Sequence, residues 1–152
     1  MRLICSPYSR KENSAKNYPH WQELIKLLVD DGHYVIQVGV GDEPKLDGCL
    51  HVFDKKLPEL EEMTREVGYF IAVDNFFHHM AYSCGVNGVV LWGPSDPLIF
   101  GYESQLNILK SREYLRKDQY GFYRGYVWPN RDKGWHGPRD VYAILFNRQQ
   151  NN

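Results

Sequence analysis

Residues 69–93 read YFIAVDNFFHHMAYSCGVNGVVLWG, and their pattern indicates the fold class of the chain. It opens with an apolar run typical of a strand. A segment with helical character follows, for which Asn75 is a good N-cap, and a second apolar run closes the stretch. Two strands that are joined by a helix run parallel within one sheet. The stretch therefore predicts a strand–helix–strand unit of an α/β protein.

The same alternation precedes this stretch. Strands are predicted at residues 2–8, 33–40 and 49–54, and helices at residues 18–32 and 57–68. Each predicted helix has a proline near its start, and Gly32 and Gly68 stand at the ends. Residues 33–40 are apolar and β-branched, as in a strand buried on both faces. The order predicts an α/β fold: a Rossmann-like open, mostly parallel sheet with helices on both faces.

The length of 152 residues predicts a single domain, with a Rossmann-like core at residues 1–101 and an aromatic-rich extension at residues 102–152. The extension lacks clear periodicity until a short helix beginning near Val141. Its interleaved Arg, Tyr and Trp side chains suit a cap folded over the sheet. They also suit a docking surface, or a surface for a glycan or nucleic acid. The net charge of −1 argues against nucleic acid.

The composition predicts a cytoplasmic protein. Cys5, Cys49 and Cys84 are odd in number and lack CxxC spacing, so we expect reduced thiols and neither a disulfide framework nor a zinc knuckle. The N-terminus lacks the pattern of a signal peptide. No apolar run approaches the roughly 18 residues that a membrane span requires.

Candidate binding residues follow the predicted strands, because ligands of open α/β sheets bind at the carboxyl ends of the strands. After residues 33–40, Glu43 could accept hydrogen bonds from a ribose diol, although GVGDEP could also be a plain turn. After residues 69–73, Asp74 and Asn75 precede a helix N-terminus suited to a phosphate. Lys16 could neutralise that phosphate or be merely solvated.

His79 lies about one turn into the predicted helix, where its imidazole could donate to a phosphate oxygen. The alternative is a buried histidine with satisfied hydrogen bonds. His78 is expected on a different face, at the surface or in packing. Adjacent histidines do not easily share an ion, and HExxH is absent, so we expect no metal and no cofactor.

Together these motifs resemble the C-terminal half of family 9 glycosyltransferases, the ADP-heptose:lipopolysaccharide heptosyltransferases. The resemblance covers roughly residues 3–101. In the family, a Lys precedes a helix, a Glu follows a Gly-rich strand end, and an Asp-Thr-Gly turn precedes a His. A Gly-Pro-Thr-Asp-Pro turn comes last. The matching segments here are AKNYPHW, VGVGDEP, DNFFHH and GPSDP.

The resemblance implies a single GT-B C-terminal domain that binds a nucleotide diphosphate sugar. The donor-binding roles carry over to Lys16, Glu43, Asp74, Asn75, His79, Ser95 and Asp96. Phe76 departs from the family, which has Gly there, and its side chain could block close approach of a diphosphate. The family's acceptor domain, which supplies the general base, has no counterpart in this sequence. No catalytic residue is therefore assigned.

Two functions follow from this resemblance. The first is a glycosyltransferase whose acceptor site is completed by a partner chain or a second copy. The second is a non-catalytic module that binds a nucleotide or nucleotide sugar, or one repurposed for interaction.

Overall fold

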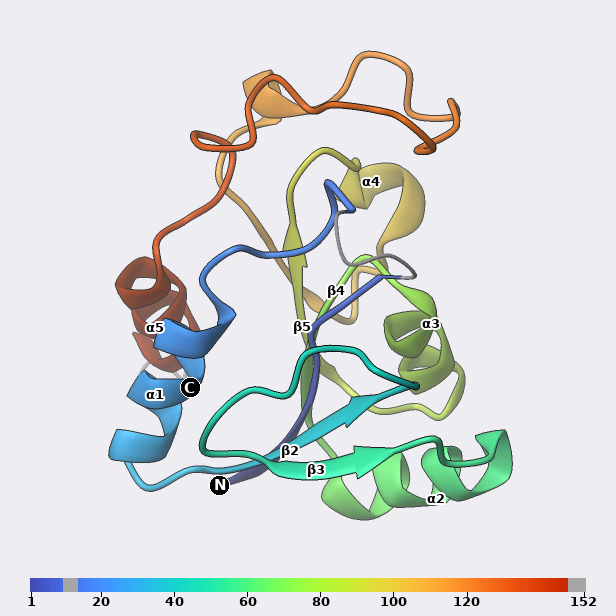
Figure 1. Ribbon diagram of the computed structural model, residues 1–152, viewed down its shortest axis with the longest axis vertical. Coiled ribbons are helices and arrows are strands. Elements are labelled where there is room, and N and C mark those ends of the chain that lie inside the picture. The colour runs from blue at the N-terminus through green and yellow to red at the C-terminus, as the bar shows by residue number, and fades with distance from the viewer. Residues whose placement is uncertain (10–13, 148–152) are drawn as a thin grey trace.

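A computed structural model describes residues 1–9 and 14–147. Its strands form one six-stranded sheet in the order β3-β2-β1-β4-β5-β6, and every neighbouring pair is parallel (Figure 1). The strands are β1 (Arg2–Ser6), β2 (Tyr34–Gly39), β3 (Leu50–Phe53), β4 (Phe70–Val73), β5 (Gly88–Trp92) and β6 (Leu106–Leu109). The order reverses direction between β1 and β4, which is where open α/β sheets form a ligand crevice.

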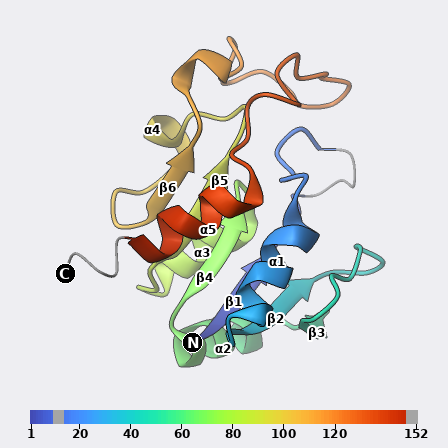
Figure 2. The same ribbon diagram turned by 90° about the vertical axis from the view of Figure 1, so that its left-hand side faces the viewer.

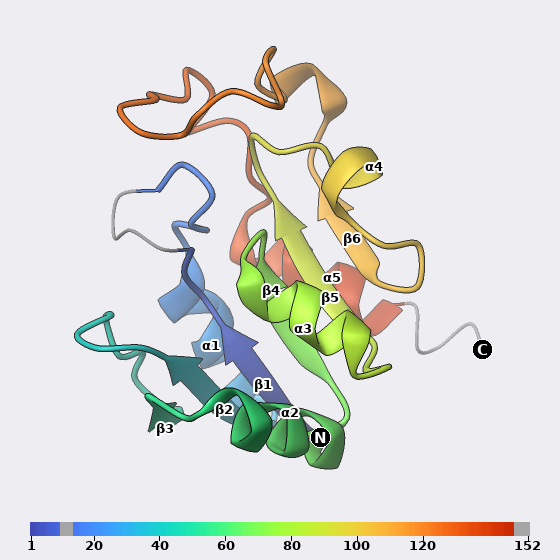
Figure 3. The ribbon, with the colours of Figure 1, turned by 90° about the vertical axis from the view of Figure 1, so that its right-hand side faces the viewer.

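Helices cover both faces of the sheet. α1 (Trp21–Asp30) and α5 (Pro138–Asn147) lie side by side on one face (Figure 2). α2 (Leu57–Val67) and α3 (Phe76–Ser83) cover the other face (Figure 3). Successive side chains of a strand point to opposite faces of the sheet, so that Leu3 and Cys5 pack toward α1 while Ile4 packs toward α3. Burial on both faces explains why β4 and β5 are apolar throughout.

Local sequence accounts for the helix boundaries. The buried residues of α1 are Trp21, Leu24, Ile25 and Leu28, which recur at helical spacing on one face. Gly68 ends α2 with φ 77°, a left-handed conformation that glycine adopts without steric cost. The side chain of Asn75 accepts a hydrogen bond from His78 N and so caps α3.

The predicted fold class and the order of elements through β5 are confirmed. The sheet continues past Gly101, however, because β6 pairs with β5 and adds an edge strand that was not predicted. The short α4 (Pro97–Phe100) and the 3₁₀ helix η1 (Arg112–Tyr114) were not predicted either. The last predicted helix starts earlier, at Pro138, and the part of that prediction beyond Asn147 lies outside the described residues.

Residues 112–137, here called the aromatic segment, connect β6 to α5. The segment consists of η1 and irregular chain, and it lies beyond the carboxyl ends of the strands (Figures 1 and 3). Within residues 1–9 and 14–147, no helix has the length and apolar character to cross a membrane.

Candidate functional site

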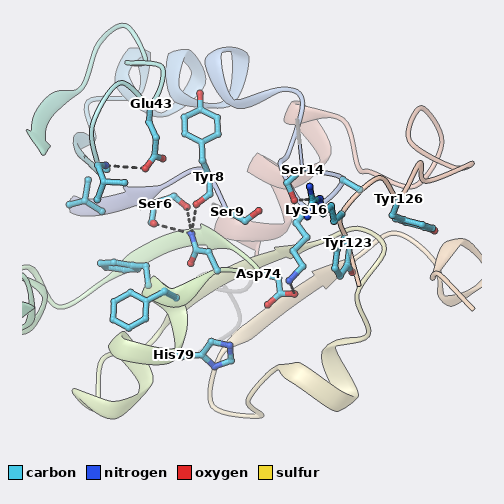
Figure 4. Close-up of a pocket in the computed structure, with 18 of the residues that line it drawn as sticks. Ser6, Tyr8, Ser9, Ser14, Lys16, Glu43, Asp74, His79, Tyr123 and Tyr126 are labelled. Carbon is cyan, nitrogen blue, oxygen red and sulfur yellow. Dashed lines mark hydrogen bonds and ion pairs between the residues drawn. The ribbon is translucent and has the colours of Figure 1, made fainter. Parts of the chain in front are cut away.

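A cavity of about 890 Å³ opens at the carboxyl ends of β1, β2 and β4 (Figure 4). The loops after these strands form one wall, and Tyr123, Tyr126 and Trp128 of the aromatic segment contribute to another. Five of the predicted binding residues line the cavity, namely Lys16, Glu43, Asp74, Asn75 and His79. Ser95 and Asp96 are not among its lining residues. The cavity is therefore built from segments far apart in sequence.

Asp74 is the electrostatic centre of the cavity floor. One carboxylate oxygen lies 3.0 Å from Lys16 Nζ, and the other lies 3.3 Å from His78 Nε2. Burial alone would raise the pKa of Asp74, but the hydrogen bond with His78 and the ammonium of Lys16 outweigh it and lower the pKa. Asp74 is therefore ionised at neutral pH. The prediction that His78 lies at the surface or in packing resolves to packing, because its side chain is fully buried.

Asp74, His78 and His79 each offer an atom within 4.8 Å of the others, a grouping that could hold a metal ion. Lys16 already supplies a positive charge to this carboxylate at 3.0 Å. The centroids of the two imidazole rings lie 3.9 Å apart, with an angle of 37° between the ring planes. The contacts of Asp74 with Lys16 and His78 account for the grouping without an ion, and the expectation of no metal stays a prediction.

Asn75 holds two strand ends together. Its Nδ2 donates to Ser6 O at 3.2 Å, to Ser6 Oγ at 3.0 Å and to Tyr8 O at 3.2 Å. Its Oδ1 caps α3. Asn75 therefore fixes the β1 loop against the start of α3, and its polar atoms are engaged in the cavity wall. The neighbouring Phe76 also lines the cavity, but its side chain is 63% exposed.

His79 lies in the cavity wall, below Asp74 in Figure 4. Its Nδ1 lies 2.7 Å from the hydroxyl of Tyr102. Burial lowers the pKa of His79, and the adjacent His78 lowers it further. His79 is thus an uncharged imidazole with one nitrogen engaged, which combines features of both interpretations of this residue from the sequence.

Glu43 stabilises its own loop at the cavity edge. Its Oε1 accepts a hydrogen bond from Val40 N at 3.0 Å. Burial raises the pKa of Glu43, and the carboxylates of Asp54 and Asp42 add to the rise, although the bond from Val40 opposes it. Glu43 thus lies at the end of β2 as predicted, with one carboxylate oxygen used by the loop.

The GPSDP turn, residues 93–97, holds the aromatic segment in place through hydrogen bonds. Pro94 O accepts hydrogen bonds from Arg116 N at 3.0 Å and from Gln119 Nε2 at 2.9 Å. The hydroxyls of Ser95 and Tyr123 lie 2.5 Å apart. The Asp96 carboxylate caps α4, and it accepts hydrogen bonds from both terminal nitrogens of Arg112, at 2.9 and 2.7 Å. Ser95 and Asp96 therefore contact the aromatic segment, which lines the cavity through residues such as Tyr123.

Sequence reasoning missed the contribution of Tyr123 to the cavity. Its ring lies 4.6 Å from Lys16 Nζ and 4.2 Å from the guanidinium carbon of Arg116. Arg116 is buried, also contacts the Tyr126 ring at 4.2 Å, and donates to Gly121 O and Phe122 O. These cation–π contacts fold the segment over Lys16. The interleaving of Arg and Tyr was the available sequence signal.

The lining of the cavity is cationic overall. The charged lining residues are Lys16, Lys55, Arg124, Arg131, Glu43 and Asp74. Four cations face two carboxylates, and one of those carboxylates is already paired with Lys16. Together with the aromatic wall and the start of α3, this composition suits a ligand that carries both ring systems and negative charge.

The architecture is shared with solved bacterial heptosyltransferases. E. coli heptosyltransferase WaaC with ADP superposes with a TM-score of 0.69 at 15% identity, over 96% of this chain and 43% of that one. The iron-containing dodecameric glycosyltransferase TibC from enterotoxigenic E. coli superposes with a TM-score of 0.68 at 18% identity, over 99% of this chain and 46% of that one. A family 9 glycosyl transferase from Veillonella parvula superposes with a TM-score of 0.61 at 18% identity, over 71% of this chain and 34% of that one. The fold is heptosyltransferase-like.

These likenesses concern fold. This chain spans less than half the length of each of these three solved structures. No protein-family model matches the sequence, and no curated protein matches it. The resemblance that four short motifs suggested agrees in fold with these solved structures.

Proposed function

We propose that this chain binds a nucleotide diphosphate sugar and forms the donor-binding part of a glycosyltransferase. The observation that carries the proposal is the cationic, aromatic-walled cavity at the point where the strand order reverses. Lys16 and the first N–H groups of α3 suit a diphosphate. The carboxylate of Glu43 suits a ribose diol. Two of the architectural neighbours are described with ADP or ADP-heptose, which agrees in ligand class.

The proposed chemistry is electrostatic. In sugar transfer, an acceptor hydroxyl forms a bond to the anomeric carbon and gives its proton to a general base. The bond between the anomeric carbon and the diphosphate oxygen breaks, and its electron pair leaves with the diphosphate. A fixed ammonium and fixed backbone N–H groups stabilise this developing charge without reorganisation. We propose that Lys16 and the start of α3 do this, and that no metal or other cofactor is required.

We further propose that another chain supplies the acceptor site and the general base. The partner is either a different protein or a second copy of this chain. Exposed apolar side chains near the cavity support this idea: Val40 is 64% exposed, Phe76 63% and Val127 81%, and all three line the cavity.

We also propose a cytoplasmic location, with which the free thiols of the three cysteines agree.

Calorimetric titration with ADP, UDP, GDP and CDP and their common sugar conjugates tests donor binding. We expect saturable binding of one nucleotide, weakened about tenfold by His79→Ala, which removes a hydrogen bond to a charged group. His51→Ala is the matched control, because His51 is exposed and does not line the cavity. Absence of binding across the whole panel would exclude the nucleotide-binding function.

The alternative is a binding module without turnover. It is favoured by the pairing of Lys16 with Asp74 at 3.0 Å, because an ammonium that is already paired has less charge to offer a leaving group. A transfer assay with a radiolabelled nucleotide sugar, with the chain alone and with candidate partner chains added, separates the two functions. Binding without transfer under every combination would favour the module.

A further inference from the structure

Tyr102 contacts His79 from a part of the chain that no predicted motif includes. It lies between α4 and β6, and its hydroxyl is 2.7 Å from His79 Nδ1. Its ring is stacked on Tyr82 of α3, with centroids 3.7 Å apart and planes within 5°. Its carbonyl accepts a hydrogen bond from Asn107 Nδ2 at 2.9 Å. The hydroxyl is therefore held in place from two sides.

The acidity of the two groups indicates which one donates. A neutral imidazole carries one proton, either on Nδ1 or on Nε2. The separation of 2.7 Å between the Tyr102 hydroxyl and His79 Nδ1 fits a hydrogen bond in either direction. A phenol O–H is a stronger acid than the N–H of a neutral imidazole, so we take the Tyr102 hydroxyl as the donor to Nδ1 of His79. The proton of the imidazole is then on Nε2.

We infer that Tyr102 is a positioning residue that fixes the proton of His79 on Nε2, so that His79 offers an uncharged N–H to the cavity. The inference rests on the proposed function only in taking a phosphate oxygen as the acceptor of this N–H. The two cavity donors then differ in kind. Lys16 supplies charge, whereas His79 supplies a hydrogen bond of fixed direction.

The environment of His79 agrees with this assignment. Burial lowers the pKa of His79, which keeps the ring neutral at pH 7. The carboxylate of Asp74 favours a second proton on the ring, but its effect on the pKa of His79 is smaller than that of burial and of His78. Lys16, 3.0 Å from that carboxylate, opposes a second proton on the ring.

Nitrogen NMR of the ligand-free protein tests the tautomer directly. In the wild-type protein at pH 7.5, we expect the His79 Nδ1 signal in the range of an unprotonated imidazole nitrogen and the Nε2 signal in the range of a protonated one. Tyr102→Phe should move both signals toward a mixture of tautomers. Tyr82→Phe is the matched control, because it keeps the stacked ring and leaves the Tyr102 hydroxyl in place. A proton on Nδ1 in the wild-type protein would overturn the inference.

Titration with ADP and with adenosine gives the functional readout. We expect Tyr102→Phe to weaken ADP binding about fivefold and to leave adenosine binding unchanged, because only the phosphate contact depends on His79. Equal losses for both ligands, or no loss for ADP, would contradict the positioning role. Failure of the wild-type protein to bind either ligand would instead contradict the proposed function and the phosphate contact, and the tautomer would still be decided by the ligand-free spectrum.

Discussion

At the scale of single residues, Asp74 connects the sheet to the cavity. It follows β4, and its side chain is 9% exposed while it contacts both Lys16 and His78. A buried carboxylate is unfavourable unless it is paired, and removing one member of such a pair leaves the others uncompensated. Asp74 therefore has a structural role beside any contact with a ligand, and the two roles can be separated by stability measurements without ligand.

Asp74→Asn should lower the free energy of unfolding at pH 7 by about 2 kcal/mol, less than for a fully buried pair because Lys16 is partly solvated. The folded-state pKa of Asp74 is lowered, so its ionised form stabilises the protein fully above the ordinary pKa of about 4. This stabilisation is lost as the pH falls through the lower folded-state pKa. The difference between wild type and variant should therefore narrow below about pH 4.

Urea unfolding between pH 3 and pH 8 measures this difference. Asp42→Asn is the control, since Asp42 is exposed near the same edge of the sheet and should have little effect. A gap between wild type and Asp74→Asn that stays constant down to pH 3 would show that the ionised carboxylate does not stabilise the fold.

At the scale of elements, the sequence predicted the helices and strands whose apolar residues recur at regular spacing. The apolar runs at β2, β4 and β5 and the stripe of α1 carry their burial pattern in local spacing. β6 does not, because it is a four-residue edge strand that contains Asn107, whose Oδ1 accepts from Trp92 Nε1. Side-chain contacts of this kind leave no periodic pattern in the sequence.

The candidate site divides in the same way. Lys16 and Asp74 were found because they lie next to predicted elements, and His79 because it lies about one turn into a predicted helix at a strand end, where open α/β sheets bind ligands. Tyr102 and Tyr123 were not found, because their roles depend on contacts with His79 and with Lys16. Such contacts depend on how the aromatic segment and β6 pack, which local sequence does not specify.

The turn after β5 offers a test of how the aromatic segment is held. A Cβ at Gly93 would overlap the indole of Trp135, which is buried against Tyr18 and Trp128. Gly93→Ala should therefore destabilise the protein by about 2 kcal/mol, the usual cost of overpacking. It should also change the near-ultraviolet circular dichroism of the tryptophans. Urea unfolding and circular dichroism measure both effects.

Gly137→Ala is the control for this substitution. The nearest atom to a Cβ at Gly137 is Asp140 Oδ2 at 3.9 Å, an ordinary contact. We expect a change in stability within about 0.5 kcal/mol. If Gly93→Ala is equally mild, the packing of Trp135 on the turn does not hold the segment.

At the scale of the whole molecule, charge and apolar exposure are unevenly distributed. Residues 110–140 contain eight Lys and Arg and four Asp and Glu, whereas residues 1–109 contain nine and fifteen. Among the described residues, the large hydrophobic side chains with at least 80% exposure all lie in α4 or the aromatic segment: Leu98, Tyr120, Phe122 and Val127. Residues 110–140 thus combine a net positive charge with three of these four exposed hydrophobic side chains, whereas residues 1–109 carry a net negative charge. A second copy therefore offers complementary charge to the end of the molecule that holds α4 and the aromatic segment.

We expect the chain to associate with itself through this end at high micromolar concentration, because apolar contact and opposite charge then act together. The double variant Leu98→Ser, Phe122→Ser should remain monomeric at a concentration where the wild-type chain sediments as a larger species. Leu50→Ser is the matched control, because Leu50 is 49% exposed at the start of β3, away from this end. Sedimentation velocity measures all three proteins, at low salt and at 0.5 M salt. Wild-type protein that stays monomeric at low salt would exclude a second copy as the partner, and equal association of the double variant would place the contact elsewhere on the surface.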